Sequence, residues 1–519
     1  MATPGRRQYA GRTNRFSTLT KVRKISVCFL LIVTAALSTL GQTGCVSPSR
    51  EGLPPGSPFR DQAELEKPSL PQGTAVGDVG THSAELWLRT DGPKQIQVEW
   101  ASVDAWKAIS AMASVKSSAA RTSPFVTSPN ADFTRTITLE HLAPNTRYRY
   151  NIWVSEPAPG QRASPPRLVA QGEFTTLPDP STAVPVVFVW SGDLGGQDHC
   201  RQGKAGYPIF DTIQEQKPDF FIFLGDTIYN DGVCPSPPNE PGSNFIATTL
   251  DEYRVKHRYQ RAAPALRRLL ERVPIYVIWD DHEVKNNFAG PFEPQMPAGR
   301  QAFREYWPIH TDVSEPQRLY RTVRYGADLE LFFLDTRQYR SRNADLDGPA
   351  KTMLGAAQLG WLLEGMAAST ATWKVVVTSV PLSVPKGGGA AVPGYDGWAG
   401  GTDGTGFERE RQVIVDTILK KRIPNVVFLG GDIHWVQANV YDPDQDGVAD
   451  FHEFVSGPLS AYAGRPSAPS PALHPTTLVN EGGYDNFGLV RATQEGFEVS
   501  ILDGTGKVRF FYRVPAVRR

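Results

Sequence analysis

Near-continuous apolar runs constrain the fold of this chain more than any other feature of its sequence. They recur after residue 184 and cover residues 184–190, 219–224, 275–279, 329–334, 373–378 and 425–429. Stretches with a helical pattern alternate with them and cover residues 251–273, 354–368 and 408–422. Apolar strands that alternate with amphipathic helices are typical of an α/β domain whose sheets are covered on both faces. Such a domain binds its ligands at the carboxyl ends of the strands.

Ionisable side chains follow five of these six apolar runs. In chain order they are Asp193; Asp226 and Tyr229; Asp280, Asp281 and His282; Asp335 and Arg337; and Asp432 and His434. A single aspartate of this kind would more often be a turn or helix-cap residue. When the pattern repeats, the carboxylates meet at one sheet edge, where they raise one another's pKa unless cations neutralise them. The repetition therefore predicts a metal cluster.

The residue types at these strand ends indicate which metals would bind. Carboxylate oxygens combined with one or two histidine nitrogens suit hard or borderline ions. The phenolate of a tyrosine such as Tyr229 is a hard anionic donor that Fe(III) would select.

Four short blocks at the strand ends carry a family resemblance. DLG, GDTIY, DDHE and GGDIH resemble the DxG, GDxxY, GNH(E/D) and GHxH blocks of the calcineurin-like metallophosphoesterases, and the tyrosine block resembles that of purple acid phosphatases. With WDDHE, LDTRQYR and a β-sandwich in front of them, residues from about 70 to 515 resemble the PhoD-like alkaline phosphatase and phosphodiesterase family. The blocks are weak singly but specific in this order.

The resemblance implies a fold, a ligand set and two metals. The fold would be a metallophosphoesterase sandwich, in which two β-sheets are flanked by helices. The first ion, Fe(3+), would be bound by Asp193, Asp226, Tyr229 and His434, and the second ion, Ca(2+), by Asp281, Asp432 and the bridging Asp226. Other divalent metals are alternatives.

Several positions depart from the pattern of the wider superfamily. Asp281 stands where the superfamily has asparagine, and Asp432 stands where it has histidine. Both changes replace a neutral donor by a carboxylate, which favours a harder second metal such as calcium. The best-known family member has a cysteine in its first block, which is SGDLGG here, and the VxxH block is missing because WKVVVTSVP ends at Pro381 without a histidine.

Two cations about 3.5–4 Å apart would activate a hydroxide and clamp the phosphate oxygens, which favours in-line attack on phosphorus. His282 is predicted to stabilise or protonate the leaving oxygen; the alternative is a structural histidine behind the metal ligands. Arg337 is predicted to offer its planar fork to the phosphoryl group; the alternative is a buried salt bridge to an aspartate such as Asp335.

The first 67 residues are predicted to contain an export signal and a linker. Basic residues precede the apolar stretch ISVCFLLIVTAALSTLG, which ends at QTGC, residues 42–45. We predict a signal peptide with a lipoprotein box over residues 1–45, with Cys45 as the lipidated residue; the alternative is a plain Sec signal. Residues 46–67 are rich in Pro, Ser and charge and read as a linker. The protein is therefore expected to be exported, as a periplasmic or membrane-anchored lipoprotein or to the outside of the cell.

Two folded domains are predicted after the linker. Residues 68–177 contain short alternating runs separated by turn residues, which is typical of a small antiparallel sandwich. Within them LAPNTRYRYNIWV resembles the tyrosine-corner stretch of a fibronectin/immunoglobulin-like β-sandwich. Residues 184–519 form the predicted metallophosphatase domain.

The net charge does not indicate any particular class of partner. Lys+Arg and Asp+Glu both count 54, and no basic stripe points to nucleic acid. Expected partners are small phosphate esters or phospholipid headgroups, with membrane contact only through the lipid anchor, and the chain is expected to be a monomer. The predicted function is an exported phosphoesterase that hydrolyses phosphate monoesters, diesters or both. The alternatives are a phospholipase-D-like phosphodiesterase and a non-catalytic lipid-anchored binding protein.

Three further features have two interpretations each. Cys200 and Cys234 either form a disulfide or remain separate thiols. The acidic stretch 442–453 has EF-hand-like spacing, yet its DQDG step is also typical of a hairpin turn. The glycine-rich stretch 387–404 is either a rim that controls substrate access or an insertion without order.

Overall fold

The computed structural model describes residues 69–111, 119–156, 164–388 and 393–517. The predicted signal peptide and lipoprotein box, with Cys45, and the linker 46–67 lie outside the described residues. No helix in the described ranges has the length and apolar character needed to cross a membrane.

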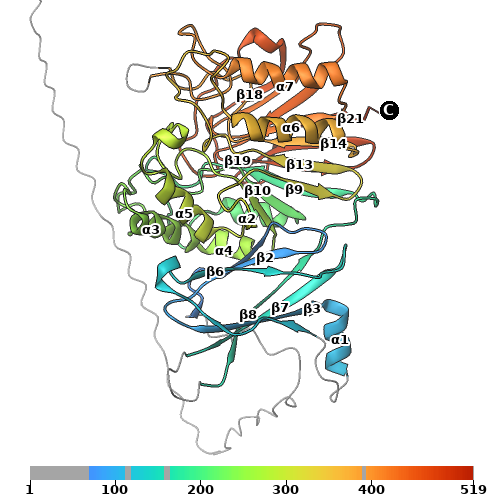
Figure 1. Ribbon diagram of the computed structural model, residues 1–519. Helices are drawn as coiled ribbons and strands as arrows, with labels where there is room; N and C mark the ends of the chain where they lie inside the picture. Colours follow the sequence, from blue (N-terminus) through green and yellow to red (C-terminus); the bar gives the residue numbers. More distant parts are fainter. Residues whose placement is uncertain (1–68, 112–118, 157–163, 389–392, 518–519) are drawn as a thin grey trace, which may run out of the picture. The chain divides into compact units, whose positions relative to one another are not determined.

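The strands form three sheets (Figure 1). The nine-stranded sheet has the order β21 (Val508–Pro515), β20 (Gly496–Asp503), β19 (Asn486–Ala492), β9 (Val186–Ser191), β10 (Phe220–Phe223), β11 (Ile275–Val277), β1 (Thr74–Gly77), β2 (Ala84–Arg89) and β6 (Thr134–Leu139). The seven-stranded sheet has the order β12 (Arg321–Tyr325), β13 (Leu329–Phe333), β14 (Trp373–Val377), β15 (Val426–Gly430), β17 (Phe451–Val455), β16 (Val436–Tyr441) and β18 (Pro475–Glu481). The five-stranded sheet has β4 (Ala120–Arg121), β3 (Gln95–Ser102), β7 (Arg147–Ser155) and β8 (Arg167–Thr175) in order, with β5 (Phe125–Val126) also paired to β3.

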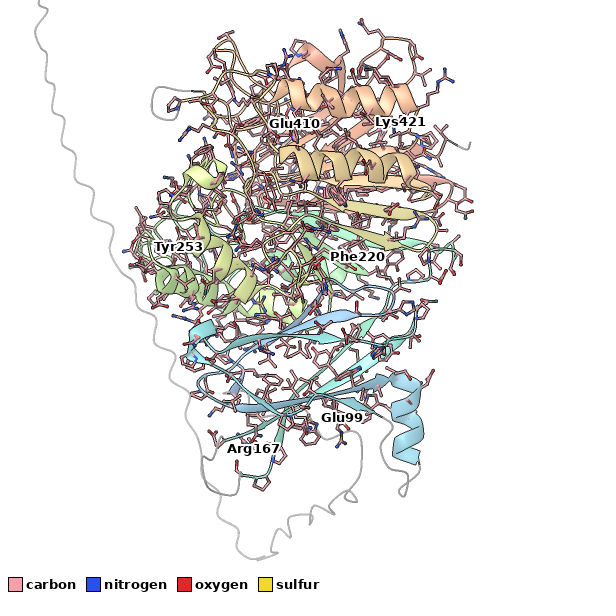
Figure 2. All side chains as sticks on the ribbon, in the orientation of Figure 1. Glu99, Arg167, Phe220, Tyr253, Glu410 and Lys421 are labelled. Carbon is pink, nitrogen blue, oxygen red and sulfur yellow. A yellow bond between two sulfur atoms is a disulfide. The ribbon has the colours of Figure 1, made fainter. Side chains whose placement is uncertain are left out.

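The six predicted apolar strands are divided equally between the two large sheets. β9, β10 and β11 are parallel neighbours in one sheet, and β13, β14 and β15 are parallel neighbours in the other. Alternate side chains of both sets meet in one buried core between the sheets, among them Phe188, Ile222, Leu331 and Val375. Phe220, labelled in Figure 2, belongs to the same core. The carboxyl ends of each parallel set therefore lie along one edge of its sheet.

Helices cover the outer faces of both large sheets (Figure 1). The helices are α1 (Val103–Ala111), α2 (Ile209–Glu215), α3 (Leu250–Arg261), α4 (Pro264–Leu270), α5 (Met296–Tyr306), α6 (Gly355–Ala368) and α7 (Glu408–Lys421). Residues of α2, α4 and α5 pack on β9–β11, and residues of α6 and α7 pack on β13–β15. The predicted single helix over 251–273 is two helices, because Pro264 cannot continue α3 and instead begins α4.

The N-terminal segment joins the main sheet. β1 pairs with β11 in parallel, with Gly77 opposite Ile275, so β1, β2 and β6 extend the nine-stranded sheet. The five-stranded sheet packs on these strands through a separate core. The amide of Ala143 donates a hydrogen bond to Tyr148 Oη at 2.8 Å, the contact of a tyrosine corner. The predicted fold class is confirmed, while the domain boundaries stay predictions because strand pairing crosses from one segment to the other.

Candidate metal centre

The proposed ligands lie at strand ends that have an unusual backbone. Asp193, Asp226, Asp432 and His434 all have positive φ, between 48° and 71°. This left-handed conformation is unfavourable for residues with a Cβ and is concentrated at functional sites. At these positions the chain turns sharply as it leaves β9, β10 and β15, which brings each side chain back toward its neighbours.

Asp193, Asp226 and His434 form the first group of possible ligands, with ligand atoms within 4.8 Å of one another. His434 Nε2 lies 3.5 Å from Asp193 Oδ1 and 3.0 Å from Tyr229 Oη. The other ring nitrogen, Nδ1, lies 2.7 Å from the carbonyl oxygen of Tyr462. Because a carbonyl only accepts hydrogen bonds, Nδ1 carries the proton, and the Nε2 lone pair faces the group. Tyr229, the other residue predicted for the first ion, lies beside this group.

Two further groups extend this one into a continuous acidic cluster. Asp226, Asp281 and His282 form the second group, and Asp280, Asp281 and Asp432 form the third. Asp226 belongs to the first and second groups, which suits a bridging ligand. All six residues predicted as metal ligands thus come together, and Asp280 joins them.

The unsatisfied atoms of this cluster fit bound cations. Five buried carboxylate oxygens of this cluster have no hydrogen-bond partner: Asp193 Oδ2, Asp226 Oδ2, Asp280 Oδ2, Asp281 Oδ1 and Asp432 Oδ2. A buried polar atom without a partner is unfavourable, and a buried charge without one far more so. Oxygen donors with a histidine and a phenol are the donor set expected for hard metal ions.

Mutual repulsion is visible in the pKa values of the cluster. Burial, together with the charges of Asp281 and Asp280, raises the pKa of Asp226 well above its usual value. Burial and the charges of Asp226 and Asp193 raise the pKa of Tyr229 in the same way. Burial also raises the pKa of Asp432. Positive ions at this position would reverse these shifts, because they stabilise the ionised forms.

Glu283 is hydrogen-bonded to the backbone that follows two neighbouring strands, β10 and β11. Its carboxylate accepts hydrogen bonds from the amides of Asp226 at 3.1 Å, Thr227 at 2.6 Å and Asp280 at 2.8 Å. Burial raises the pKa of Glu283 to about 7. The DDHE block therefore contains predicted ligands and also the residue that holds the turn after β10.

His282 lies against the cluster and is held by Asp231. Its Nδ1 is 2.6 Å from Asp231 Oδ1, and its ring stacks on Tyr229 with centroids 4.0 Å apart. Nε2 lies 4.0 Å from Asp281 Oδ1. Burial opposes protonation, but the charges of Asp281 and Asp231 raise the pKa of His282. An imidazolium at this position can donate a proton.

Arg337 is enclosed by carboxylates. Its side chain is completely buried; Nε donates to Asp280 at 2.6 Å, and the two terminal nitrogens donate to Asp396 at 2.8 and 2.9 Å. Arg337 donates to Asp335 with its backbone amide and not with its guanidinium, and the Asp335 carboxylate also accepts hydrogen bonds from Trp279 and Gln338. These contacts agree with the buried ion-pair alternative, with Asp280 and Asp396 as the partners in place of Asp335.

Sequence reasoning missed three residues that support the cluster: Asp231, Lys386 and Asp396. Asp231 follows the tyrosine block by two positions, which was a usable signal. Lys386 and Asp396 lie beside and within the glycine-rich stretch 387–404, where no periodic pattern indicates which side chains turn inward. Lys386 contacts Asp432 with its ammonium group.

The cysteine pair and the acidic stretch are also placed by the structure. Cys200 and Cys234 form a disulfide. Residues 442–450 connect the antiparallel strands β16 and β17, as the hairpin alternative requires. Oxygens of Asp442, Asp444 and Asp450 lie within 4.8 Å of one another. Glu453, the twelfth position of the EF-hand pattern, is buried in β17 and bonded to Tyr441 and to the amide of Leu382, so it does not serve this loop.

The two-sheet sandwich with an acidic cluster at its strand ends defines the fold class of the metallophosphoesterases. A family profile described as PhoD-like phosphatase matches residues 188–499, and one described as its N-terminal domain matches residues 56–178. The chain therefore belongs to the PhoD-like phosphatase family.

Individual relatives agree with this assignment. Alkaline phosphatase D of Bacillus subtilis (strain 168) is 29% identical over 404 residues, which cover 70% of this chain and 64% of the relative. A solved structure of PhoD superposes with a TM-score of 0.66 at 23% identity, over 87% of this chain and 93% of the other. A purple acid phosphatase from yellow lupin (Lupinus luteus) seeds superposes with a TM-score of 0.57 at 12% identity, over 86% and 75%. At these identities both structures show the fold.

Proposed function

We propose that this chain is an exported, metal-dependent phosphoesterase that hydrolyses phosphate monoesters, diesters or both. The observation that carries the proposal is the set of five buried, unpartnered carboxylate oxygens at the ends of strands from both large sheets. Membership of the PhoD-like phosphatase family and the similarity to alkaline phosphatase D support the same reaction.

The proposed ligand sets follow the two ends of the cluster. Asp193, Asp226, Tyr229 and His434 would hold the first ion, for which Fe(III) suits the phenolate. Asp226, Asp281 and Asp432 would hold the second ion, for which Ca(II) suits the all-carboxylate donors. When bound, such ions lower the pKa of a water molecule and polarise the phosphoryl group.

The proposed work of the protein's own side chains is to bind, orient and move a proton. Asp231 fixes His282 through Nδ1, so that Nε2 remains available to protonate the leaving oxygen. Arg337 has no free fork for a substrate; its proposed role is to position Asp280 and Asp396 and to offset part of the negative charge.

Export is proposed on the N-terminal pattern and is supported by the disulfide, because disulfides persist in oxidising compartments. Periplasmic or lipid-anchored placement through Cys45, small phosphate esters or phospholipid headgroups as substrates, and a monomeric state complete the proposal. A phospholipase-D-like specificity would use the same cluster, and a binding protein without turnover is the non-enzymatic alternative.

The proposal is tested by assaying purified protein with para-nitrophenyl phosphate and with bis(para-nitrophenyl) phosphate after metal analysis. We expect turnover of at least one ester by a preparation that contains at least two metal ions per chain. A tyrosinate-to-iron(III) absorption band that is lost in Tyr229→Phe would support iron at the first position. A fully metallated preparation that leaves both esters intact would favour the binding protein.

A further inference from the structure

Lys386 places a cationic side chain beside the acidic cluster. It follows β14 and immediately precedes the glycine-rich stretch. Its Nζ donates to the carbonyl oxygen of Asp432 at 3.1 Å and also contacts Asp432 Oδ1. The other carboxylate oxygen of Asp432, Oδ2, is among the unpartnered atoms. Lys386 therefore occupies one side of Asp432 and leaves the other side to the cluster.

The backbone of Lys386 is fixed independently of that contact. Its carbonyl oxygen accepts a hydrogen bond from the amide of Asp396 at 2.7 Å. The carboxylate of Asp396 is in turn held by Arg337, by Arg340 at 2.8 Å and by Asn343 at 2.8 Å. The base of the glycine-rich stretch is thus anchored to the same buried network that supports the cluster, and the ammonium group has a defined position.

Lys386 differs from Arg337 in its access to solvent. The Arg337 side chain is fully buried and its donors are directed at carboxylates, whereas 26% of the Lys386 side chain is exposed. An ammonium group has three donors, and the two contacts with Asp432 leave one. Of these two cations, Lys386 is therefore the one whose side chain is partly open to solvent.

We propose that Lys386 binds substrate, donating its remaining N–H to a non-bridging phosphoryl oxygen and favouring dianionic phosphate monoesters over monoanionic diesters. The inference rests on the proposed function and adds a substrate class to it. Around pH 8 a monoester carries close to two negative charges, because its second pKa is near 6, whereas a diester carries one. A fixed ammonium group therefore interacts more strongly with the monoester.

The test compares Lys386→Met, Lys386→Arg and the parent on the two para-nitrophenyl esters around pH 8, with metal content measured for each preparation. We expect Lys386→Met to lower kcat/KM for the monoester about tenfold or more relative to the diester, as for loss of a charge-assisted hydrogen bond. Lys386→Arg should restore most of the ratio. Lys420→Gln, which removes an exposed lysine of α7 paired with Asp416, is the control and should leave the ratio unchanged.

Calorimetric binding of inorganic phosphate to the metallated protein gives a readout that does not require turnover. Lys386→Met should weaken phosphate binding by a similar factor. Equal losses on both esters, or loss of metal with both activities, would overturn the proposal, because Lys386 would then act only through Asp432. A parent that binds phosphate but hydrolyses neither ester would contradict the proposed function and leave the lysine testable by calorimetry.

Discussion

Asp226 combines two features that are unfavourable for the folded protein: a buried carboxylate and a left-handed backbone. Its pKa is raised by burial and by neighbouring carboxylates. Without bound cations, the folded protein would be more stable if this carboxylate were uncharged. Cations that share its oxygens would offset the unfavourable burial of its charge. We therefore treat Asp226 as the central residue of the site.

Asp226→Asn removes the shared charge and keeps the shape of the side chain. We expect kcat/KM for phosphate esters to fall by about a thousandfold or more, because the stabilisation of transition-state charge by metal is worth several kcal/mol. The circular dichroism spectrum should not change. Normal turnover by this variant would contradict the assignment of Asp226 as a bridging ligand.

After metal removal, the stability of the protein should fall as pH rises. The folded-state pKa values of Asp226, Asp432 and Glu283 are raised, the last to about 7, so the folded state binds more protons than the unfolded state above about pH 4. The contribution of these three groups to the free energy of unfolding is fully present below about pH 4. It is lost as pH rises through their folded-state pKa values. The melting temperature of metal-free protein should therefore be lower at pH 8 than at pH 5, and metal should remove most of the difference.

Matched measurements with Asp226→Asn serve as the control for this pH dependence. Without that carboxylate, the metal-free variant should lose less stability between pH 5 and pH 8 than the parent. Identical pH profiles for the two proteins would show that the repulsion lies elsewhere.

At the residue scale, the sequence allows the position of a side chain to be predicted where a strand fixes it. Asp193, Asp226 and Asp432 follow apolar strands directly. Parallel pairing of β9 with β10 brings the first two together, and the packing of the two large sheets brings Asp432, which follows β15, to the same cluster. Lys386 and Asp396 reach the cluster from irregular backbone, whose path depends on contacts far away in sequence. The guanidinium of Arg337 is directed at Asp280 and Asp396. The pairing with Asp396 could not be predicted, because Asp396 also lies in irregular backbone.

Among the structural elements, the segments on either side of the tyrosine block are held by a cross-link. The disulfide joins Cys200 to Cys234 across 34 positions, and the tyrosine block lies between them. Closing a loop of this length is worth about 2–4 kcal/mol, mainly by restricting the unfolded chain.

Replacing both cysteines by serine should lower the free energy of unfolding by that amount. Urea unfolding of the parent in the presence of reductant should give a similar loss, and reductant should have no further effect on the double variant. Equal midpoints for parent and variant without reductant would show that the cross-link does not form in solution.

The acidic hairpin follows the EF-hand spacing in sequence, but its structure departs from the motif at the twelfth position. The spacing of its aspartates follows the EF-hand pattern, but the strands on either side turn Glu453 into the core next to Tyr441. Sequence spacing alone does not reveal which face of a strand a side chain takes.

At the scale of the whole molecule, strands of the N-terminal sandwich belong to the nine-stranded sheet that carries part of the acidic cluster. Trp87 of β2 is completely buried; its Nε1 donates to the carbonyl oxygen of Glu305 at 2.7 Å, and the guanidinium of Arg261 lies 3.8 Å from its ring centroid. The sequence predicted both folds but treated them as separate domains, because no pattern in a strand specifies its partner at a sheet edge.

Trp87→Ala should therefore destabilise the part that carries the acidic cluster as well as the sandwich. We expect a loss of about 3–5 kcal/mol, as for other large buried aromatic residues, and a parallel fall in the temperature at which ester hydrolysis is lost. Val126→Ala, at an exposed position of the same segment, should change stability by less than about 0.5 kcal/mol. Unchanged thermal inactivation of hydrolysis in Trp87→Ala would indicate two independent domains.

The most direct measurement of the whole account is hydrolysis of both para-nitrophenyl esters by protein stripped with a chelator and then reconstituted, with metal content determined at each step. We predict that hydrolysis disappears with the metal and returns when metal occupies the cluster. Full hydrolysis by protein that retains almost no metal, or none by fully loaded protein, would contradict the account.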